Sequence, residues 1–311
     1  MLARGRTAGQ GAGHRLCVSA VRRYSIGMTH QHPVALVTGA SRGIGRSIAV
    51  MLSKQGFRLL LVSRGLEGLE KTARLCADGT PEGIVLSTED LTQSEAPRRI
   101  IQRAAETFGR LDLLVNNAGA VVSGPIGSYT LEQWEGVMGL NARAPFFLMQ
   151  EALPLLRAAP RGCIINIGSV VAKAAYADQS LYSASKHALL GMTKAAARDL
   201  GADGIRVHAV LPGGVNTSMI GDVRPDIDTS ELISPDEVAE TVRFLLSMED
   251  NADDRQAQTK PVMPQLGTRD AHSGPDSGRD AAERHARGTP LVAVLESDCT
   301  RFDAVIVGPL V

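Results

Sequence analysis

The stretch VALVTGASRGIGRSIAV, residues 34–50, places a short apolar run directly before three closely spaced glycines and a helix-forming segment. Gly39, Gly43 and Gly45 allow a tight turn and close packing of the helix that follows. The first backbone amides of such a helix attract the charge of a phosphate group. A simple strand-to-helix turn is the alternative, but this placement at the start of an α/β unit favours a site for the pyrophosphate of a dinucleotide.

Further along the chain, short apolar runs alternate with amphipathic, helix-forming stretches. The runs lack a polar alternation, as expected for strands that are covered on both faces. Parallel neighbours need helical crossovers, so the order predicts an α/β fold with a three-layer doubly wound parallel sheet, the Rossmann fold, in a single domain over residues 32–248. The predicted strands are residues 34–38, 58–63, 84–88, 111–116, 163–168 and 205–210, and helical stretches such as 93–109 and 131–157 lie between them.

Polar residues follow several of these strands, at the edge where doubly wound sheets bind ligands. Asp90 and Leu91 follow the third strand, where the carboxylate would accept a hydrogen bond from an adenine and the leucine would pack on its ring. The segments 116–119 and 212–217 and the residue Ser169 follow later strands. Each has a local alternative, such as a helix cap, a turn or a strand end. Their common edge favours one ligand site.

The second strand ends at Ser63 and Arg64, where an NAD-binding chain usually carries an acid for the adenosine ribose. Arg64, together with Arg42 in the glycine-rich turn, instead offers two guanidinium groups for a 2′-phosphate. The sequence therefore predicts NADP(H) as the cofactor rather than NAD(H).

The segment YSASK, residues 182–186, places Tyr182 and Lys186 four residues apart in a helix-forming stretch, so that both side chains share one face. Such a pair also occurs by chance on amphipathic helices, and its meaning depends on the site upstream. A nearby ammonium favours the phenolate, so Lys186 is expected to lower the pKa of Tyr182 from its ordinary value of about 10.

Composition narrows the choice of partners. The chain has 311 residues, with 33 basic and 33 acidic side chains, which gives no electrostatic case for nucleic acid or an anionic membrane. No apolar run approaches the roughly 18 residues that a membrane span requires. The four cysteines have no CxxC spacing, so no metal site is predicted. A small-molecule partner is expected.

The two ends of the chain differ from the middle. Residues 1–31 hold five arginines and no acid, which predicts a mitochondrial presequence and a matrix location, the alternative being a disordered basic extension. Residues 249–289 are polar and rich in Gly, Pro, Asp and Arg, a composition that predicts a disordered linker. Residues 290–311 contain two short apolar runs, 291–296 and 303–308, that would serve as substitute edge strands or would belong to a segment without evolved structure.

The motifs TGASRGIG (38–45), NNAG (116–119), IGSV (167–170), YSASK (182–186) and PGGVNT (212–217), with Asn141 between the second and third, resemble those of the short-chain dehydrogenase/reductases. The resemblance covers about residues 33–248. It implies an NADP(H)-dependent oxidoreductase. The cofactor-binding residues that it implies, together with the strand ends above, are Gly39, Ser41, Arg42, Gly43, Ile44, Gly45, Arg64, Asp90, Leu91, Asn117, Ala118, Gly119, Tyr182, Lys186, Pro212, Gly213, Val215 and Thr217.

The same resemblance implies a catalytic tetrad of Asn141, Ser169, Tyr182 and Lys186. Tyr182 would give its proton to a carbonyl oxygen, and Lys186 would tune the phenol and bind the ribose hydroxyls of the cofactor. Ser169 would hydrogen-bond the substrate oxygen, and Asn141 would anchor a water that connects Lys186 to solvent.

Within the family the motifs look similar to those of 3-oxoacyl-[acyl-carrier-protein] reductases, and a mitochondrial address would suit organellar fatty-acid synthesis. Two departures leave a broad-specificity carbonyl or quinone reductase open. Of the two basic residues that those reductases offer to the acidic carrier protein, Arg198 matches one, while the other falls on Ser128. Residues 217–237 form a shorter covering segment. A non-catalytic NADP-binding partner subunit, or an inactive isoform, is a further alternative. Homo-oligomers are expected, weakened by the atypical C-terminus.

Overall fold

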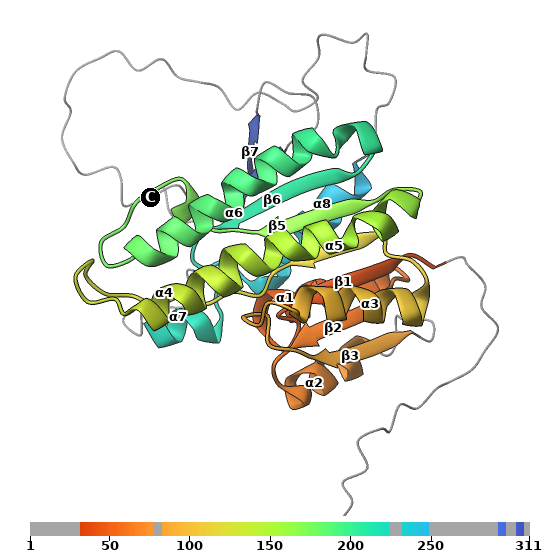
Figure 1. Cartoon of the computed structure of the whole chain (residues 1–311), viewed down its shortest axis with the longest axis horizontal. Helices are drawn as coiled ribbons and strands as arrows, with labels where there is room; N and C mark the ends of the chain where they lie inside the picture. Colours follow the sequence, from red (N-terminus) through yellow and green to blue (C-terminus); the bar gives the residue numbers. More distant parts are fainter. Residues whose placement is uncertain (1–31, 77–82, 224–231, 249–291, 297–302, 308–311) are drawn as a thin grey trace, which may run out of the picture. The chain divides into compact units, whose positions relative to one another are not determined.

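The computed structural model describes residues 32–76, 83–223, 232–248, 292–296 and 303–307. In this part of the chain the strands form one sheet in the order β3-β2-β1-β4-β5-β6-β8-β7 (Figure 1). The first six are parallel to one another, which confirms the predicted doubly wound α/β fold. Their bounds are β1 Val34–Thr38, β2 Arg58–Ser63, β3 Ile84–Thr88, β4 Leu113–Asn116, β5 Cys163–Ile167 and β6 Arg206–Pro212.

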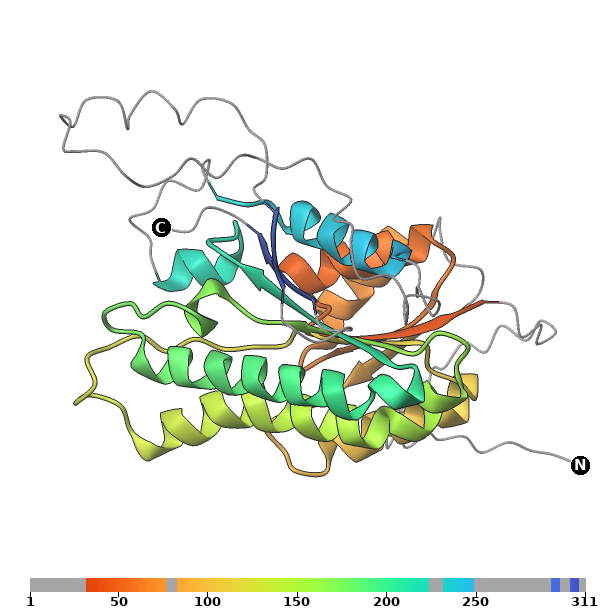
Figure 2. The same ribbon diagram turned by 90° about the horizontal axis from the view of Figure 1, so that it is seen from above.

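Helices cover both faces of the sheet. Figure 2 shows α4, α5 and α6 (yellow-green to green) on one side and α1 and α8 (orange and cyan) on the other. The long crossovers between parallel strands require this arrangement. The helices are α1 Gly43–Lys54, α2 Leu66–Cys76, α3 Ala96–Phe108, α4 Leu131–Met138, α5 Ala144–Ala158, α6 Ser180–Asp199, α7 Ser218–Val223 and α8 Pro235–Ser247, with short turns η1 Gly139–Arg143, η2 Val170–Ala172 and η3 Gly201–Asp203.

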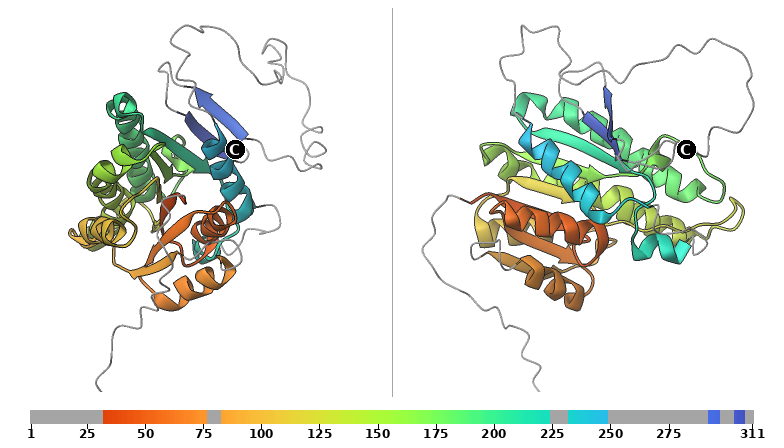
Figure 3. Two further views of the ribbon diagram at one scale, coloured as in Figure 1. Left: turned by 90° about the vertical axis from the view of Figure 1, so that its right-hand side faces the viewer. Right: turned by 180° about the vertical axis from the view of Figure 1, so that it is seen from behind.

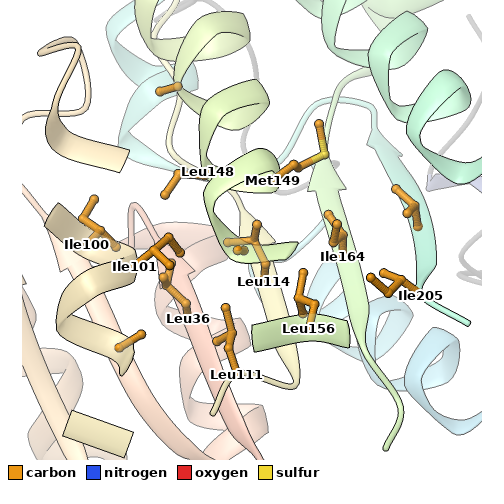
Figure 4. Close-up of a cluster of buried hydrophobic side chains, with 14 of the residues drawn as sticks. Leu36, Ile100, Ile101, Leu111, Leu114, Leu148, Met149, Leu156, Ile164 and Ile205 are labelled. Carbon is orange, nitrogen blue, oxygen red and sulfur yellow. The ribbon is translucent and has the colours of Figure 1, made fainter. Parts of the chain in front are cut away.

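Each strand divides its apolar side chains between the two faces. Leu36, Leu114 and Ile164 are buried on the side of α3, α5 and α6, where Figure 4 shows them gathered with Ile100 and Leu148 from the helices. Their sequence neighbours are buried on the side of α1 and α8. Each fully buried Leu or Ile contributes about 1.5–3 kcal/mol relative to exposure. The continuous apolar runs in the sequence follow from this two-sided burial.

Local signals set where several helices begin. The Thr130 hydroxyl accepts a hydrogen bond from the Gln133 amide while the Gln133 side chain accepts one from the Thr130 amide, a capping box at the start of α4. Ser234 and Glu237 form the same arrangement at α8. These reciprocal bonds satisfy backbone amides that have no partner within the helix.

The structure differs from several predicted boundaries: β5 ends at Ile167 rather than 168, β6 spans Arg206–Pro212 rather than 205–210, and α3 spans Ala96–Phe108 rather than 93–109. The fourth strand begins at Leu113 rather than 111, and the carboxylate of Asp112 just before it accepts a hydrogen bond from the Val34 amide at 2.8 Å. The helical stretch 131–157 is divided by η1, a π-helical turn in which the Ala144 amide bonds the carbonyl of Gly139. Such turns insert an extra residue and re-aim the side chains that follow.

The edge of the sheet beyond β6 is formed by the C-terminal part of the chain. β8 (Asp303–Val307) pairs in parallel with β6, and β7 (Val292–Glu296) pairs antiparallel with β8. Figure 3 shows these strands in blue beside β6. This is the position that the sequence analysis gave to substitute edge strands. The predicted presequence, residues 1–31, and the predicted linker, 249–289, lie outside the described residues.

Candidate active site

The carboxyl ends of the strands surround a cleft of about 370 Å³. Its lining comes from the turns after β1 to β5, from α6 and from the segment after β6. Topology therefore brings together residues that are widely separated in the sequence. The sequence-predicted residues that line it are Gly39, Ser41, Arg42, Gly43, Ile44, Arg64, Asp90, Leu91, Asn117, Ala118, Gly119, Tyr182, Lys186 and Thr217.

The glycine-rich turn is closely packed beneath the cleft. Gly39 has a φ of +66°, in the left-handed region that favours glycine. A Cβ on Gly45 would lie 2.4 Å from both the Gly39 carbonyl oxygen and the Asn117 side-chain nitrogen. Because these positions carry no side chain, α1 begins directly against the turn, and its first residues, Gly43 and Ile44, line the cleft. The arrangement fits the pyrophosphate of a dinucleotide.

Thr38 joins this turn to the one after β4. Its hydroxyl accepts hydrogen bonds from the amides of Asn117 and Ala118 at 2.9 and 3.0 Å and donates to the Val115 carbonyl at 3.2 Å. The Asn117 side chain in turn donates to the Thr38 carbonyl at 2.9 Å. Sequence reasoning missed Thr38, although a threonine at the buried end of an otherwise apolar strand is a usable signal.

At the adenosine end of the predicted site, Arg42 and Arg64 line the cleft with exposed side chains. Asp90 lies beside them, and one of its carboxylate oxygens accepts hydrogen bonds from the Thr92 amide and hydroxyl at 2.9 and 2.7 Å. These bonds, with a smaller effect of Arg64, hold the pKa of Asp90 below its ordinary value. Asp90 therefore forms a local turn as well as lining the cleft.

Tyr182 and Lys186 lie on the inner side of the cleft. The Lys186 ammonium donates a hydrogen bond to the Ile167 carbonyl at 3.0 Å and lies 5.8 Å from the centroid of the Tyr182 ring. Burial lowers the pKa of Lys186 from 10.5 to about 8. The pair expected from the i,i+4 spacing is thus present at the site.

The pKa of Tyr182 departs from the expectation. Burial raises the pKa of the phenol, and a hydrogen bond with Ser169 acts in the opposite direction to a smaller extent. The predicted lowering is wrong for the protein alone. The physical reason is that burial destabilises the charged phenolate by more free energy than the hydrogen bond with Ser169 stabilises it.

Ser169 and Asn141 are next to lining residues without being part of the lining. Ser169 precedes η2, and its hydroxyl accepts the Val171 amide at 3.4 Å. The Asn141 side chain bonds the amide and carbonyl of Ala120, both at 2.8 Å, and donates to the Ser185 hydroxyl at 3.0 Å. A Cβ on Gly119 would meet both the Asn141 oxygen and the Lys186 nitrogen. Asn141 is therefore next to Lys186, with its own side-chain amide already engaged.

Some predicted residues lie outside the lining, and others were missed. Pro212 ends β6, and Val215 is buried and bridges to Ile233, so with Gly213 they support the segment that carries Thr217. Gly45, Asn141 and Ser169 also contribute from behind the surface. The lining residues that sequence reasoning missed are Ser63, Gly65, Glu89, Thr92, Leu140, Ile167, Gly168, Ser218 and Met219, most of them direct neighbours of predicted ones.

No group of three or more His, Cys, Asp or Glu side chains in the described part of the chain is arranged to hold a metal ion. No helix there is long and apolar enough to cross a membrane.

Comparison with known proteins gives consistent matches. Residues 33–228 match the short chain dehydrogenase family. An uncharacterized oxidoreductase of Staphylococcus saprophyticus is 32% identical over 232 residues, covering 75% of this chain and 98% of that protein. Among solved structures, a metagenomic short-chain oxidoreductase in complex with NADP is 34% identical, with a TM-score of 0.62, covering 72% of this chain and 95% of that one. Levodione reductase is 30% identical, with a TM-score of 0.65 and coverages of 69% and 90%.

Proposed function

This chain belongs to the short chain dehydrogenase family of oxidoreductases, and on that premise we propose that it reduces a ketone to a secondary alcohol with NADPH. The observation that carries the proposal is that Tyr182 and Lys186 line a cleft that Arg42 and Arg64 also line, with Ser169 hydrogen-bonded to Tyr182 beside it. Such a site places an acid and hydrogen-bond donors where charge develops on a carbonyl oxygen.

Two features of the cleft support NADP(H) as the cofactor: the glycine-rich turn and the pair of arginines. The glycine-rich turn leaves its backbone free of side chains, which suits a pyrophosphate, while Arg42 and Arg64 suit a 2′-phosphate. The similar metagenomic oxidoreductase was solved in complex with NADP. When bound, this cofactor supplies the hydride that the carbonyl carbon accepts.

The chain's own residues supply the rest of the reaction. Tyr182 donates its hydroxyl proton to the carbonyl oxygen as negative charge builds there, and its raised pKa keeps the phenol protonated beforehand. Ser169 donates a hydrogen bond to the same oxygen. The Lys186 ammonium, held by the Ile167 carbonyl, stabilises the phenolate that remains. General acid assistance of this kind contributes about 10²- to 10⁴-fold in rate.

For the substrate we propose a 3-oxoacyl group carried on acyl carrier protein, which the resemblance of the glycine-rich and YSASK motifs supports. A broad-specificity reductase of small ketones or quinones is the second candidate. It is favoured by the structural similarity to levodione reductase and by Ser128, a neutral residue where a contact with an acidic carrier would call for a basic one. A non-catalytic role is less well supported, because Asn141, Ser169, Tyr182 and Lys186 are all present near the cleft.

The test is an assay of NADPH oxidation by the full-length protein. Acetoacetyl-acyl carrier protein and a panel of small ketones and quinones are supplied in parallel, and the native mass is recorded. Preference for the carrier-linked substrate by at least about tenfold in kcat/KM supports the first candidate, and the reverse preference supports the second. No oxidation with any substrate would argue for the non-catalytic alternative.

We also propose that residues 1–31 direct the protein to the mitochondrial matrix, on the strength of their five arginines and lack of acids. A fluorescent fusion of these residues is expected to enter mitochondria, and a fusion in which the five arginines are replaced by glutamine serves as the control. A cytosolic signal from the unchanged fusion would overturn the proposal.

A further inference from the structure

A chain of buried amide and hydroxyl groups connects β4, β5 and α6 behind the cleft. The Asn116 side chain donates to the Asn166 side-chain oxygen at 2.8 Å, and the Asn166 amide donates to the Thr193 hydroxyl at 2.8 Å. The three residues are 2%, 0% and 0% exposed, and none of them lines the cleft. Burying polar groups so completely is unfavourable unless they are hydrogen-bonded to one another, so the chain of bonds imposes a defined geometry.

The position of this chain ties it to the proposed catalytic pair. Asn166 directly precedes Ile167, whose carbonyl accepts a hydrogen bond from the Lys186 ammonium at 3.0 Å. Thr193 follows Lys186 by seven residues, two turns along α6, so both side chains lie on the same face of that helix. Helix α6 is therefore joined to the end of β5 at two neighbouring points, one through Lys186 and one through Thr193.

The hydrogen bonds of Lys186 and Thr193 to the end of β5 have different roles. The Lys186 ammonium is buried and depends on its acceptor, because a buried charge without a hydrogen bond is strongly unfavourable. Thr193 also donates to the Leu189 carbonyl at 2.5 Å, which fixes the orientation of its hydroxyl toward Asn166. A small shift of α6 along β5 would lengthen the Lys186 bond and move Tyr182 on the same helix. A misplacement of about 1 Å can cost up to about 100-fold in rate.

We propose that Thr193 and Asn166 are positioning residues, whose hydrogen bond sets the placement of α6 on β5 and thereby holds Lys186 and Tyr182 in their working geometry. The inference rests on the proposed function of that pair. Asn116 extends the chain to β4, which carries the turn at 117–119 on the cofactor side of the cleft. The three buried groups would then align both sides of the reaction site.

The test replaces the Thr193 hydroxyl by a methyl group of the same size in the full-length protein, Thr193→Val. We expect kcat to fall about tenfold and the pH dependence of kcat to shift, while the Kd for NADPH changes less than about twofold. Thr193→Ser keeps the hydroxyl and should recover kcat to within about threefold of the wild type. Thr193→Cys, with a weaker hydrogen-bonding group, should fall between the serine and valine variants.

Thr241→Val is the matched control. Thr241 is also a buried threonine on a helix, and its hydroxyl donates to the Glu237 carbonyl at 3.0 Å. It lies on α8, on the opposite face of the sheet. The control should lose stability with kcat and the pH profile unchanged. If Thr193→Val behaves in the same way, the role of Thr193 is structural and the proposal is overturned. Should Thr193→Val fail to fold, equal kcat in the serine and cysteine variants would overturn it instead.

A second readout does not depend on turnover. The titration of Lys186, followed by NMR of its side chain and assigned with Lys186→Arg, is expected at a pKa of about 8 in the wild type. Thr193→Val should move this pKa, and Thr241→Val should leave it unchanged. A shift in an enzyme without ketone reductase activity would uphold the positioning role while the proposed function fails. An unmoved pKa would count against the positioning role alone.

Discussion

The ammonium of Lys186 lies 5.8 Å from the ring centroid of Tyr182, and both residues line the cleft, Lys186 buried and Tyr182 partly buried. Burial disfavours the charged form of each side chain, so it raises the pKa of the phenol and lowers the pKa of the amine. The ordinary pKa values, 10.0 for the phenol and 10.5 for the amine, lie close together, and burial moves them apart. A proton-donating phenol beside a readily neutralised amine is therefore a property of this environment.

Removing the phenolic hydroxyl should abolish most of the chemistry and leave binding intact. Tyr182→Phe is expected to lower kcat by at least about 100-fold, because the general acid is lost. The Kd for NADPH, measured by the fluorescence of the bound cofactor, should stay within about threefold of the wild type. Tyr129→Phe, which removes a phenol outside the cleft lining, is the control. Near-normal turnover in Tyr182→Phe would contradict the mechanism.

The buried lysine should make stability depend on pH. The folded-state pKa of Lys186 is about 8 and its ordinary value is 10.5, so between these values the unfolded chain binds more protons than the folded one. Stability then rises with pH across this window. In urea titrations at pH 7, 8.5 and 10, the free energy of unfolding of the wild type minus that of Lys186→Met should increase with pH. A constant or falling difference would show that the ammonium is not desolvated.

Cofactor preference should depend on the two exposed arginines. Arg64→Ala and Arg42→Ala are each expected to lower kcat/KM for NADPH by about tenfold or more, since a charge-assisted hydrogen bond contributes about 1.5–3 kcal/mol. The value for NADH should change little, because that cofactor lacks the 2′-phosphate. Arg74→Ala, an exposed arginine at the end of α2, is the control. Equal losses with both cofactors would remove the case for phosphate recognition.

The glycine-rich turn should not accept a methyl group. In Gly45→Ala the new Cβ would lie 2.4 Å from the Gly39 carbonyl oxygen, so the start of α1 must move. We expect a lower Tm and a weaker Kd for NADPH by at least about tenfold. Gly191→Ala on α6 meets nothing within 4 Å and should instead stabilise the protein, by up to about 1 kcal/mol, through helix propensity. Unchanged NADPH binding in Gly45→Ala would exclude the turn from the cofactor site.

Much of this site could be predicted from the amino-acid sequence. The continuous apolar runs and the glycine spacing predicted a parallel sheet with a phosphate-binding turn, because both depend on local geometry and on a general rule of sheet topology. Fourteen of the cofactor residues that the family resemblance and the strand ends implied line the cleft. Pro212, Gly213 and Val215 do not, since the chain after β6 turns inward to bridge with Ile233 before it reaches the cleft at Thr217.

Other features depend on contacts between distant segments. Asn141, within the π-helical turn η1, bonds the backbone of Ala120, and the bond between Asn166 and Thr193 requires α6 to lie on β5. No local pattern specifies either contact. Placement of β8 beside β6 likewise came from pairing across a long separation in the chain.

Residue spacing alone established that Tyr182 and Lys186 share a helical face, and the glycines and apolar runs established which kind of sheet carries them. Folding decided the pKa values of the two groups, because it withdrew both side chains from bulk water. It also placed the Ile167 carbonyl where it accepts a hydrogen bond from the ammonium. Spacing along a helix is a local property of the backbone, whereas the loss of solvent around a charge depends on everything that packs against it.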